Sequence, residues 1–368
     1  IDNGGTAQVV GTAPPTVGSL RVGSANSGSV EISGGGALAS NSFGIFGGNS
    51  GSSGTLAISG AGSSLTLPGE LRIARLGTAT VLIEDGGALT SNTTGSTIDT
   101  ILAENSGSVA SVTIQGAGSS WRENGLFRIA ARLNGGSGGT AELTVATGGT
   151  LSSNGGVLSR GAAADAAVTV TGNGSEWDAG AFDIFVGAGI GDNPAVLVVE
   201  EEGRILAQDI VIWAADTQPE SHKVRLGNGA APAFLNIRRV FGAGNGIGGG
   251  VLEGVLEINH DAADYYLTSD GTAGGTPVAL GGELIVNHIG SGTTIIVADN
   301  ETIGTVNVDA GEFIVEGAFF QLTTPFGLDS VFNVNAGGTL GGSGRVVDVV
   351  VASEGTIAPG RSIGTLRA

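Results

Sequence analysis

The residues that could perform chemistry in this chain are few and scattered. A serine nucleophile is typical of a Gly-Asp-Ser-Gly string, but the nearest string is Gly48-Asn49-Ser50-Gly51, which lacks the aspartate and has no strand-flanked histidine nearby. This string is interpreted as a loop. The three histidines are His222, His260 and His288, and the last two each follow an asparagine after a strand-like run. That parallel predicts a shared turn position rather than a triad or a metal pair.

Two places combine the side chains that a polysaccharide lyase or hydrolase would need, which are carboxylates grouped with basic residues. Glu200-Glu201-Glu202-Gly203-Arg204 is the densest acidic run and is interpreted as a solvated turn. His260-Asp261 with Asp264-Tyr265-Tyr266 combines His, Asp and Tyr and is interpreted as the edge of a coil. Gly246-Ile247-Gly248-Gly249-Gly250 is glycine-rich but lacks the aspartate of a calcium-binding repeat. We therefore predict no catalytic, cofactor-binding or metal-binding residue.

Tryptophan could instead bind sugars. Trp121 and Trp177 stand at equivalent positions of a repeat, and Leu65 stands there in an earlier copy. An apolar residue in all three copies predicts a core position, although a ladder of exposed rings for sugar binding is the alternative. Trp213 lies outside this pattern and is the better candidate for an exposed ring.

These residues belong to a chain that repeats itself. LAISGAGSSL (56–65), VTIQGAGSSW (112–121) and VTVTGNGSEW (168–177) each begin 56 residues after the one before. A fixed period of this length indicates a repeat architecture rather than an ordinary globular domain. We expect the equivalent residues Ile58, Ile114 and Val170 to point into one continuous core.

Composition identifies the kind of repeat. Glycine accounts for 69 of the 368 residues, aromatic residues for 5% and charged residues for 13%. Short apolar/polar alternations such as 29–32, 141–145 and 305–308 have the period of a strand and end at Gly, Asn or Ser. We predict an all-β protein, a right-handed parallel β-helix (β-solenoid) of about 18 coils with roughly 18–20 residues each. An array of β-sandwich modules is the alternative.

Charge and missing residue types exclude further classes. The net charge is −19 and no cluster of four basic residues occurs, so nucleic acid and anionic lipid are poor partners. The absence of cysteine excludes disulfides and thiolate sites. No methionine is present, even at position 1, which indicates a processed or excised piece. No apolar run is long enough to span a membrane.

The C-terminal part carries a recognisable pattern. NAGGTLGGSGRVVDVVVASEGTIAPGRSIGTL (335–366), with its Gly-Thr-Leu-x-Gly-x-Gly and Ala-Pro-Gly-x-Ser-x-Gly-Thr-Leu stretches, resembles the end of passenger domains of bacterial type V autotransporters. LEINHDAADYYL (256–267) with GSGTTIIVADN (290–300) looks like a passenger-associated repeat. The resemblance covers 18–210 and 255–366, while 211–254 matches nothing recognisable. It implies one β-helix, with 56-residue units in 1–254 and passenger-associated repeats in 255–368.

The same resemblance implies a function and a location. Such a passenger crosses the periplasm and is displayed on the surface of a Gram-negative bacterium through its own outer-membrane β-barrel, expected after residue 368. We predict an adhesin, not an enzyme, whose partner is a copy of itself on a neighbouring cell or host matrix or glycan. A polysaccharide-degrading enzyme and an inert stalk are the alternatives. The candidate interaction turns are rich in Ser, Thr and Asn and comprise Asn92, Thr93, Thr94, Ser152, Ser153 and Asn154.

Overall fold

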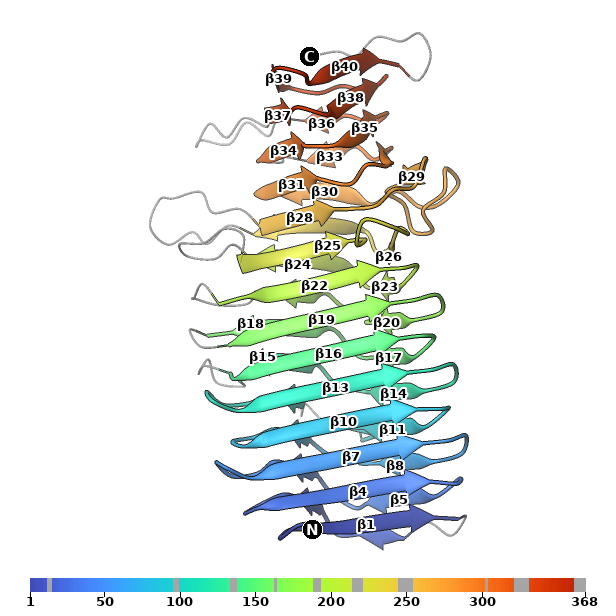
Figure 1. Ribbon diagram of the computed structural model, residues 1–368, viewed down its shortest axis with the longest axis vertical. Helices are drawn as coiled ribbons and strands as arrows, with labels where there is room; N and C mark the ends of the chain where they lie inside the picture. Colours follow the sequence, from blue (N-terminus) through green and yellow to red (C-terminus); the bar gives the residue numbers. More distant parts are fainter. Residues whose placement is uncertain are drawn as a thin grey trace.

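The computed structural model of the chain describes ten segments of the sequence. They are residues 1–11, 15–94, 99–132, 138–161, 164–187, 193–213, 221–243, 254–301, 304–320 and 331–360. These segments contain strands and turns and no α-helix, and therefore no helix that could span a membrane. Every strand-to-strand ladder among the described residues is parallel, and the chain forms an elongated solenoid with β1 and β40 at opposite ends (Figure 1).

The strands form four parallel sheets that run along the solenoid. Sheet A contains β1 (Gly5–Val10), β4 (Ser27–Ser33), β7 (Ser53–Ser59), β10 (Thr78–Glu84), β13 (Val109–Gln115), β16 (Thr140–Ala146), β19 (Asp165–Thr171), β22 (Ala195–Glu200), β25 (His222–Leu226), β28 (Gly254–Ile258), β31 (Leu284–His288), β34 (Thr305–Val308), β37 (Val331–Val334) and β39 (Asp348–Val351). Sheet B contains β2 (Thr16–Val17), β5 (Ala37–Ser40), β8 (Ser64–Thr66), β11 (Ala88–Ser91), β14 (Ser120–Glu123), β17 (Thr150–Ser152), β20 (Glu176–Asp178), β23 (Arg204–Leu206) and β26 (Phe234–Asn236).

The remaining strands form sheets C and D. Sheet C contains β3 (Leu20–Val22), β6 (Gly44–Phe46), β9 (Leu71–Ile73), β12 (Thr100–Leu102), β15 (Phe127–Ala131), β18 (Gly156–Arg160), β21 (Ile184–Val186), β24 (Asp209–Trp213), β27 (Arg239–Ala243), β30 (Ala279–Gly282), β33 (Asn300–Glu301) and β36 (Phe319–Phe320). Sheet D contains β29 (Tyr265–Tyr266), β32 (Thr293–Ile296), β35 (Gly311–Val315), β38 (Gly338–Gly342) and β40 (Thr356–Pro359).

The predicted fold class is confirmed. In Figure 1 the strands of sheet A run from left to right in the foreground, and the chain returns behind them as it climbs, which gives a right-handed coil. Ile58, Ile114 and Val170 are all fully buried, and the intervening strands place them in one inward-facing column of sheet A. Alternation of apolar and polar residues therefore sets which face of each strand enters the core.

The predicted number of coils is wrong. Ile58 faces Ile83, which faces Ile114, so the 56-residue repeat holds two coils and not three. Each coil is longer than expected because most coils contain strands of three sheets joined by three turns. Within the described residues sheet A has 14 strands, whereas about 18 coils were expected. At a strand spacing of about 4.8 Å the solenoid extends about 60 Å, not 90 Å.

The two-coil period arises from two kinds of turn that alternate between sheets A and B. One is the Gly-x-Gly-Ser turn that ends at Ser63, Ser119 and Ser175, and the other is the Gly-Gly turn of the coil before it. The buried serine hydroxyl accepts a hydrogen bond from the backbone N–H of a glycine in that preceding turn. These donors and acceptors are paired as Gly35 and Ser63 at 3.1 Å, Gly86 and Ser119 at 3.0 Å, and Gly148 and Ser175 at 3.0 Å. Successive coils are thus interlocked in pairs.

The architecture changes after β26. Sheet B ends at β26 and sheet D begins at β29, while sheet A continues through both parts without a break. The core changes as well, because four rings contact one another from coil to coil. His260 packs on His288, His288 packs on Phe313, and Phe313 packs on Phe332, with ring centroids 5.8–6.4 Å apart. The division of the chain at residue 254 itself stays a prediction.

The last described strands of sheets A and D, β39 and β40, are incompletely covered. Val350, Val351 and Ile357 in β39 and β40 are 56%, 43% and 41% exposed. Val334 and Leu340, the register partners of Val351 and Ile357 one coil earlier, are fully buried. Residues 361–368, which include the end of the Ala-Pro-Gly-x-Ser-x-Gly-Thr-Leu stretch, lie outside the described residues. The glycine-rich stretch 246–250 also lies outside them.

Candidate interaction surface

The outer face of sheet A is lined by polar ladders. Outward residues in register from coil to coil include Ser29, Thr55, Thr80 and Ser111. Further along the solenoid, Asn307 donates to Asn287 at 2.8 Å and Asn333 donates to Asn307 at 2.9 Å through their side-chain amides. Short hydroxyl side chains from β4 to β13 and amide side chains from β31 to β37 therefore present hydrogen-bonding groups on two parts of this face.

The outer face of sheet C has a different composition. One outward column alternates arginine with aliphatic residues and then becomes aromatic. Its members are Arg21, Ile45, Arg72, Ile101, Arg128, Val157, Phe185, Val211 and Phe241. Arg72 pairs with Glu70 and Glu104, so acidic neighbours balance this charge. Trp213 lies half-buried on the same face, unlike Trp121 and Trp177.

Trp121, Trp177 and Leu65 are core residues, as their repeat position predicts. Their exposed fractions are 1%, 0% and 0%. Each indole N–H donates to a buried serine hydroxyl, from Trp121 to Ser91 at 2.8 Å and from Trp177 to Ser153 at 2.9 Å. The alternative of a ladder of exposed tryptophans for sugar binding is therefore excluded at these positions.

The six candidate turn residues lie at the end of sheet B strands, in two turns that are two coils apart along one side of the solenoid. Thr93, Thr94 and Asn154 are exposed and Ser152 is half-buried. Asn92 and Ser153 are only 1% and 6% exposed, so these two cannot contact a partner, which corrects their assignment to the surface. Their side chains serve internal hydrogen bonds instead. The other four remain a prediction.

A buried polar network explains why Asn92 is internal. The carboxylate of Glu123 accepts hydrogen bonds from the hydroxyls of Ser91 and Thr100, and from the backbone N–H of Gly125 at 2.8 Å. The side chain of Asn92 also hydrogen-bonds to this carboxylate. Burial raises the pKa of Glu123 despite these bonds, because removal from water disfavours the charged form. The network is structural and does not open to solvent.

The histidines do not form a triad. His222 is buried, with its imidazole between the carbonyl oxygens of Trp213 and Asn193 at 2.8 and 3.1 Å. The predicted shared turn position of His260 and His288 is wrong. His288 is the last residue of β31 and is in register with Ile258, whereas His260 lies two residues beyond the end of β28. Their ring centroids are 6.0 Å apart in the core. The described residues contain no group of three metal-ligating side chains. The Gly48–Gly51 string forms the turn before β7, with Asn49 and Ser50 at its tip.

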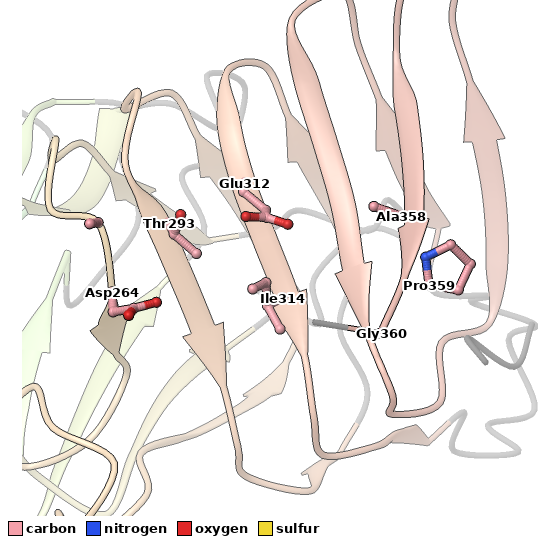
Figure 2. Close-up of a pocket in the computed structure, with 8 residues that line it drawn as sticks. Asp264, Thr293, Glu312, Ile314, Ala358, Pro359 and Gly360 are labelled. Carbon is pink, nitrogen blue, oxygen red and sulfur yellow. The ribbon is translucent and has the colours of Figure 1, made fainter. Parts of the chain in front are cut away.

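The His-Asp-Tyr group is divided by the backbone. His260 and Tyr265 point inward and pack against each other, with ring centroids 4.8 Å apart, and the Tyr265 hydroxyl donates to the carbonyl oxygen of Ala233 at 2.7 Å. Asp264 points outward into a hollow of about 490 Å³ on the outer face of sheet D (Figure 2). The hollow is lined by Ala263, Asp264, Thr293, Glu312, Ile314, Ala358, Pro359 and Gly360. None of these is basic, so the carboxylate-and-base arrangement of a lyase is not assembled there.

The acidic run 200–204 forms the wall of a second hollow, a groove of about 340 Å³ at the turn between sheets A and B. Glu202 and Arg204 line it together with Glu176 and Phe234. The groove was not predicted from the sequence, because its three groups of residues, at 173–176, at 202–204 and at Phe234, are 26 or more positions apart and meet only through the strand register. The signal in the sequence that could have indicated the groove is the replacement of small residues by large ones at one position of the repeat.

Comparison with known proteins gives one relative in sequence. The chain is 27% identical over 321 residues to the adhesin BmaC autotransporter of Brucella suis biovar 1 (strain 1330). This match covers 84% of the chain and 8% of the relative, so the chain corresponds to a small part of that protein. No protein-family model matches the sequence.

A solved structure of a TibC-catalysed, hyperglycosylated TibA fragment covers the full length of both chains at 14% identity with a TM-score of 0.30, which is too low to support an inference. The sequence relative, the repeat motifs and the solenoid agree with one another. Relatives of this kind are surface-exposed or secreted bacterial proteins. The chain therefore has a parallel β-solenoid fold and is similar in sequence to part of an autotransporter adhesin, in agreement with the resemblance of its motifs.

Proposed function

We propose that this chain is an adhesive part of a bacterial surface protein. The observation that carries the proposal is the match along 84% of the chain to an autotransporter whose name describes an adhesin. A solenoid supports this role physically, because each coil contacts only its neighbours and a long side surface is left free for partners.

The proposed mechanism is attachment through side-chain ladders along the solenoid. The partner is a copy of the protein on a neighbouring cell, or host matrix protein or glycan. Two molecules of net charge −19 repel each other at long range, so self-association needs contact regions that are locally neutral. The Ser, Thr and Asn ladders of sheet A and the turns containing Thr93, Thr94 and Asn154 meet this condition.

The proposed route to the surface is export through the periplasm and then through the protein's own outer-membrane barrel. The lack of cysteine supports this route, because a disulfide would close a loop that is difficult to pass through a narrow pore. Folding of successive coils outside the cell would then favour outward movement.

A second candidate function is saccharide hydrolysis. It is supported by the groove that brings Glu176 and Glu202 near Arg204, since a pair of carboxylates is what glycoside hydrolysis requires. We favour the adhesive role because the sequence relative is named as an adhesin.

The test compares bacteria that display the full protein with bacteria that display the same protein without these 368 residues. We expect the deletion to reduce cell clumping, attachment to matrix-coated surfaces, or both, at equal surface expression. Unchanged clumping and unchanged attachment would contradict the proposed function. Release of reducing sugar from polysaccharide by the purified chain would instead favour the hydrolase.

A further inference from the structure

The groove between sheets A and B lies where the sequence stops following the 56-residue repeat. It occupies the last three strands of sheet B, β20, β23 and β26. Its volume of about 340 Å³ is in the range of small-ligand sites. The groove is lined by Asn173, Gly174, Ser175, Glu176, Glu202, Arg204 and Phe234, all of them within described segments.

An outward column of sheet B shows the change of pattern. In the regular coils this column holds only small side chains, which are Ala37, Ser64, Ala88, Ser120 and Thr150. The next three members in register are Glu176, Arg204 and Phe234. Small residues suffice for the scaffold, so an acidic, a basic and an aromatic side chain in succession require another explanation.

The turn above the groove departs from the repeat at the same place. Gly86 and Gly148 have φ values of 85° and 86° in their Gly-Gly turns, and Glu202 takes the equivalent position with a φ of 66°. A side chain in this left-handed region strains the backbone, which glycine avoids. Glutamate at this position therefore costs stability while it places a carboxylate at the rim of the groove.

The charged groups that the structure describes in the groove form no ion pairs with one another. Glu176 and Arg204 are register neighbours, yet they form no ion pair with each other or with any other residue that the structure describes. The guanidinium of Arg204 lies 5.8 Å from the centre of the Phe234 ring. The side-chain amide of Asn173 donates to the carboxylate of Glu202 at 2.6 Å, which holds that carboxylate in place.

The aromatic ring is held from its other side. Gly271, in the loop after β29, packs so closely on Phe234 that a Cβ at this position would lie 2.7 Å from the ring. The ring therefore forms a rigid apolar wall beside the charged groups. Rigid aromatic surface contributes binding without loss of side-chain freedom.

We propose that this groove binds a neutral saccharide. A sugar offers adjacent hydroxyls that donate to the carboxylate of Glu176 and accept from the guanidinium of Arg204, and C–H faces that pack on Phe234. Two carboxylates against one guanidinium leave the groove acidic, which disfavours sialic or uronic acids. This inference rests on the proposed adhesive function, for which it names a ligand class and a site.

The test measures binding of neutral and acidic oligosaccharides to the purified 368-residue chain by saturation-transfer NMR and titration. The neutral probes are trisaccharides of glucose, galactose, mannose and N-acetylglucosamine, and the acidic probe is sialyllactose. We expect millimolar binding of at least one neutral probe. Glu176→Gln and Phe234→Ala should each weaken it about tenfold or more. Thr150→Ala, in the same column one coil earlier, should leave it unchanged.

Thermal unfolding of each variant separates loss of the groove from loss of the fold, and Glu176→Gln keeps the shape of the side chain. Absence of binding by every neutral probe would overturn the inference, as would tighter binding of sialyllactose or equal binding by the groove variants. These results do not depend on cell attachment. A chain that binds sugar while cells fail to attach would refute the proposed adhesive function and leave the groove site standing.

Discussion

The regular coils from β3 to β27 and the C-terminal coils from β28 to β38 share sheet A but are stabilised in different ways. In the regular coils the inward column of sheet A is aliphatic, and alternating turns are joined by serine hydrogen bonds. In the C-terminal coils His288 takes a place in the column between Ile258 and Val308, and rings stack from coil to coil. The first part repeats the same core and turn arrangement from coil to coil, and the second part does not.

This difference indicates which positions of a repeat protein are expected to be functional. Stability in a solenoid comes from neighbouring coils, so a regular repeat needs no other purpose than to stack. The groove lies on the last strands of sheet B, at the junction between the two parts. Departures from the repeat that cost stability, such as Glu202 at positive φ, mark the positions that a scaffold alone would not require.

The largest effect is expected from truncation of a buried ring in either part. Trp177 and Phe313 are both fully buried, so changing either to alanine leaves a cavity and should lower the local free energy of unfolding by about 3–5 kcal/mol. Because coils contact only their neighbours, Trp177→Ala should speed hydrogen exchange around β20 and spare β35, and Phe313→Ala should do the reverse. Equal acceleration along the whole chain would show that the two parts do not unfold separately.

The next effect is acid sensitivity of the C-terminal coils. Burial, followed by the neighbouring His288, lowers the pKa of His260 to about 4, and burial lowers the pKa of His288, although Asp261 and Asp309 oppose these shifts. The unfolded chain takes up protons on its histidines below about pH 6.5, whereas His260 in the folded coils accepts a proton only near pH 4. The contribution of the neutral, buried His260 to the free energy of unfolding is therefore fully present above about pH 6.5. About 3 kcal/mol of it should be lost as the pH falls to 4.

Hydrogen exchange of β28 to β35 at pH 7.5 and pH 5, corrected for the intrinsic rate, measures this loss. His288→Val, which copies Val308 and Val334 in the same column, should weaken the pH dependence. The regular coils provide the opposite sign, because a raised pKa at Glu123 means that the folded state gains stability as the pH falls. Equal acid sensitivity of both parts would refute the contrast.

A smaller effect tests the interlocked turns of the regular coils. Ser119→Ala removes the acceptor for the backbone N–H of Gly86 in a buried turn and should cost about 1 kcal/mol. Ser120→Ala, one residue further and facing outward, is the matched control and should change little. Denaturant unfolding of the two variants gives the comparison. A Ser120→Ala variant as unstable as Ser119→Ala would mean that the hydrogen bond is not the cause.

The smallest effect on stability, within about 0.5 kcal/mol, is expected at the exposed turns. Thr94→Asp and Asn154→Asp add charge at these turns, and Thr55→Asp adds it on the face of sheet A. If the turns mediate self-association, the first two should reduce clumping more than the third, and added salt should strengthen clumping by screening repulsion over about 8–10 Å. Clumping that is unchanged by all three substitutions and that weakens as salt is added would exclude these turns as contacts.

The sequence predicted the fold class and the buried positions because strand alternation records which side chains face inward. The number of coils was predicted wrongly because the 56-residue period is the distance between two turns of the same type. Two turn types alternate in this chain, so each period contains two coils. The burial of Asn92 and Ser153 was missed because both residue types also occur in exposed turns. The groove was missed because Glu176 and Phe234 become neighbours of Arg204 only through register.

The adhesive role is tested most directly with beads that carry the purified 368-residue chain. Their clumping and their attachment to matrix-coated and glycan-coated surfaces are compared with those of beads that carry the heat-unfolded chain at equal density. The folded chain should cause clumping or attachment severalfold above the unfolded control. Folded and unfolded chains that behave alike on every surface would contradict the account.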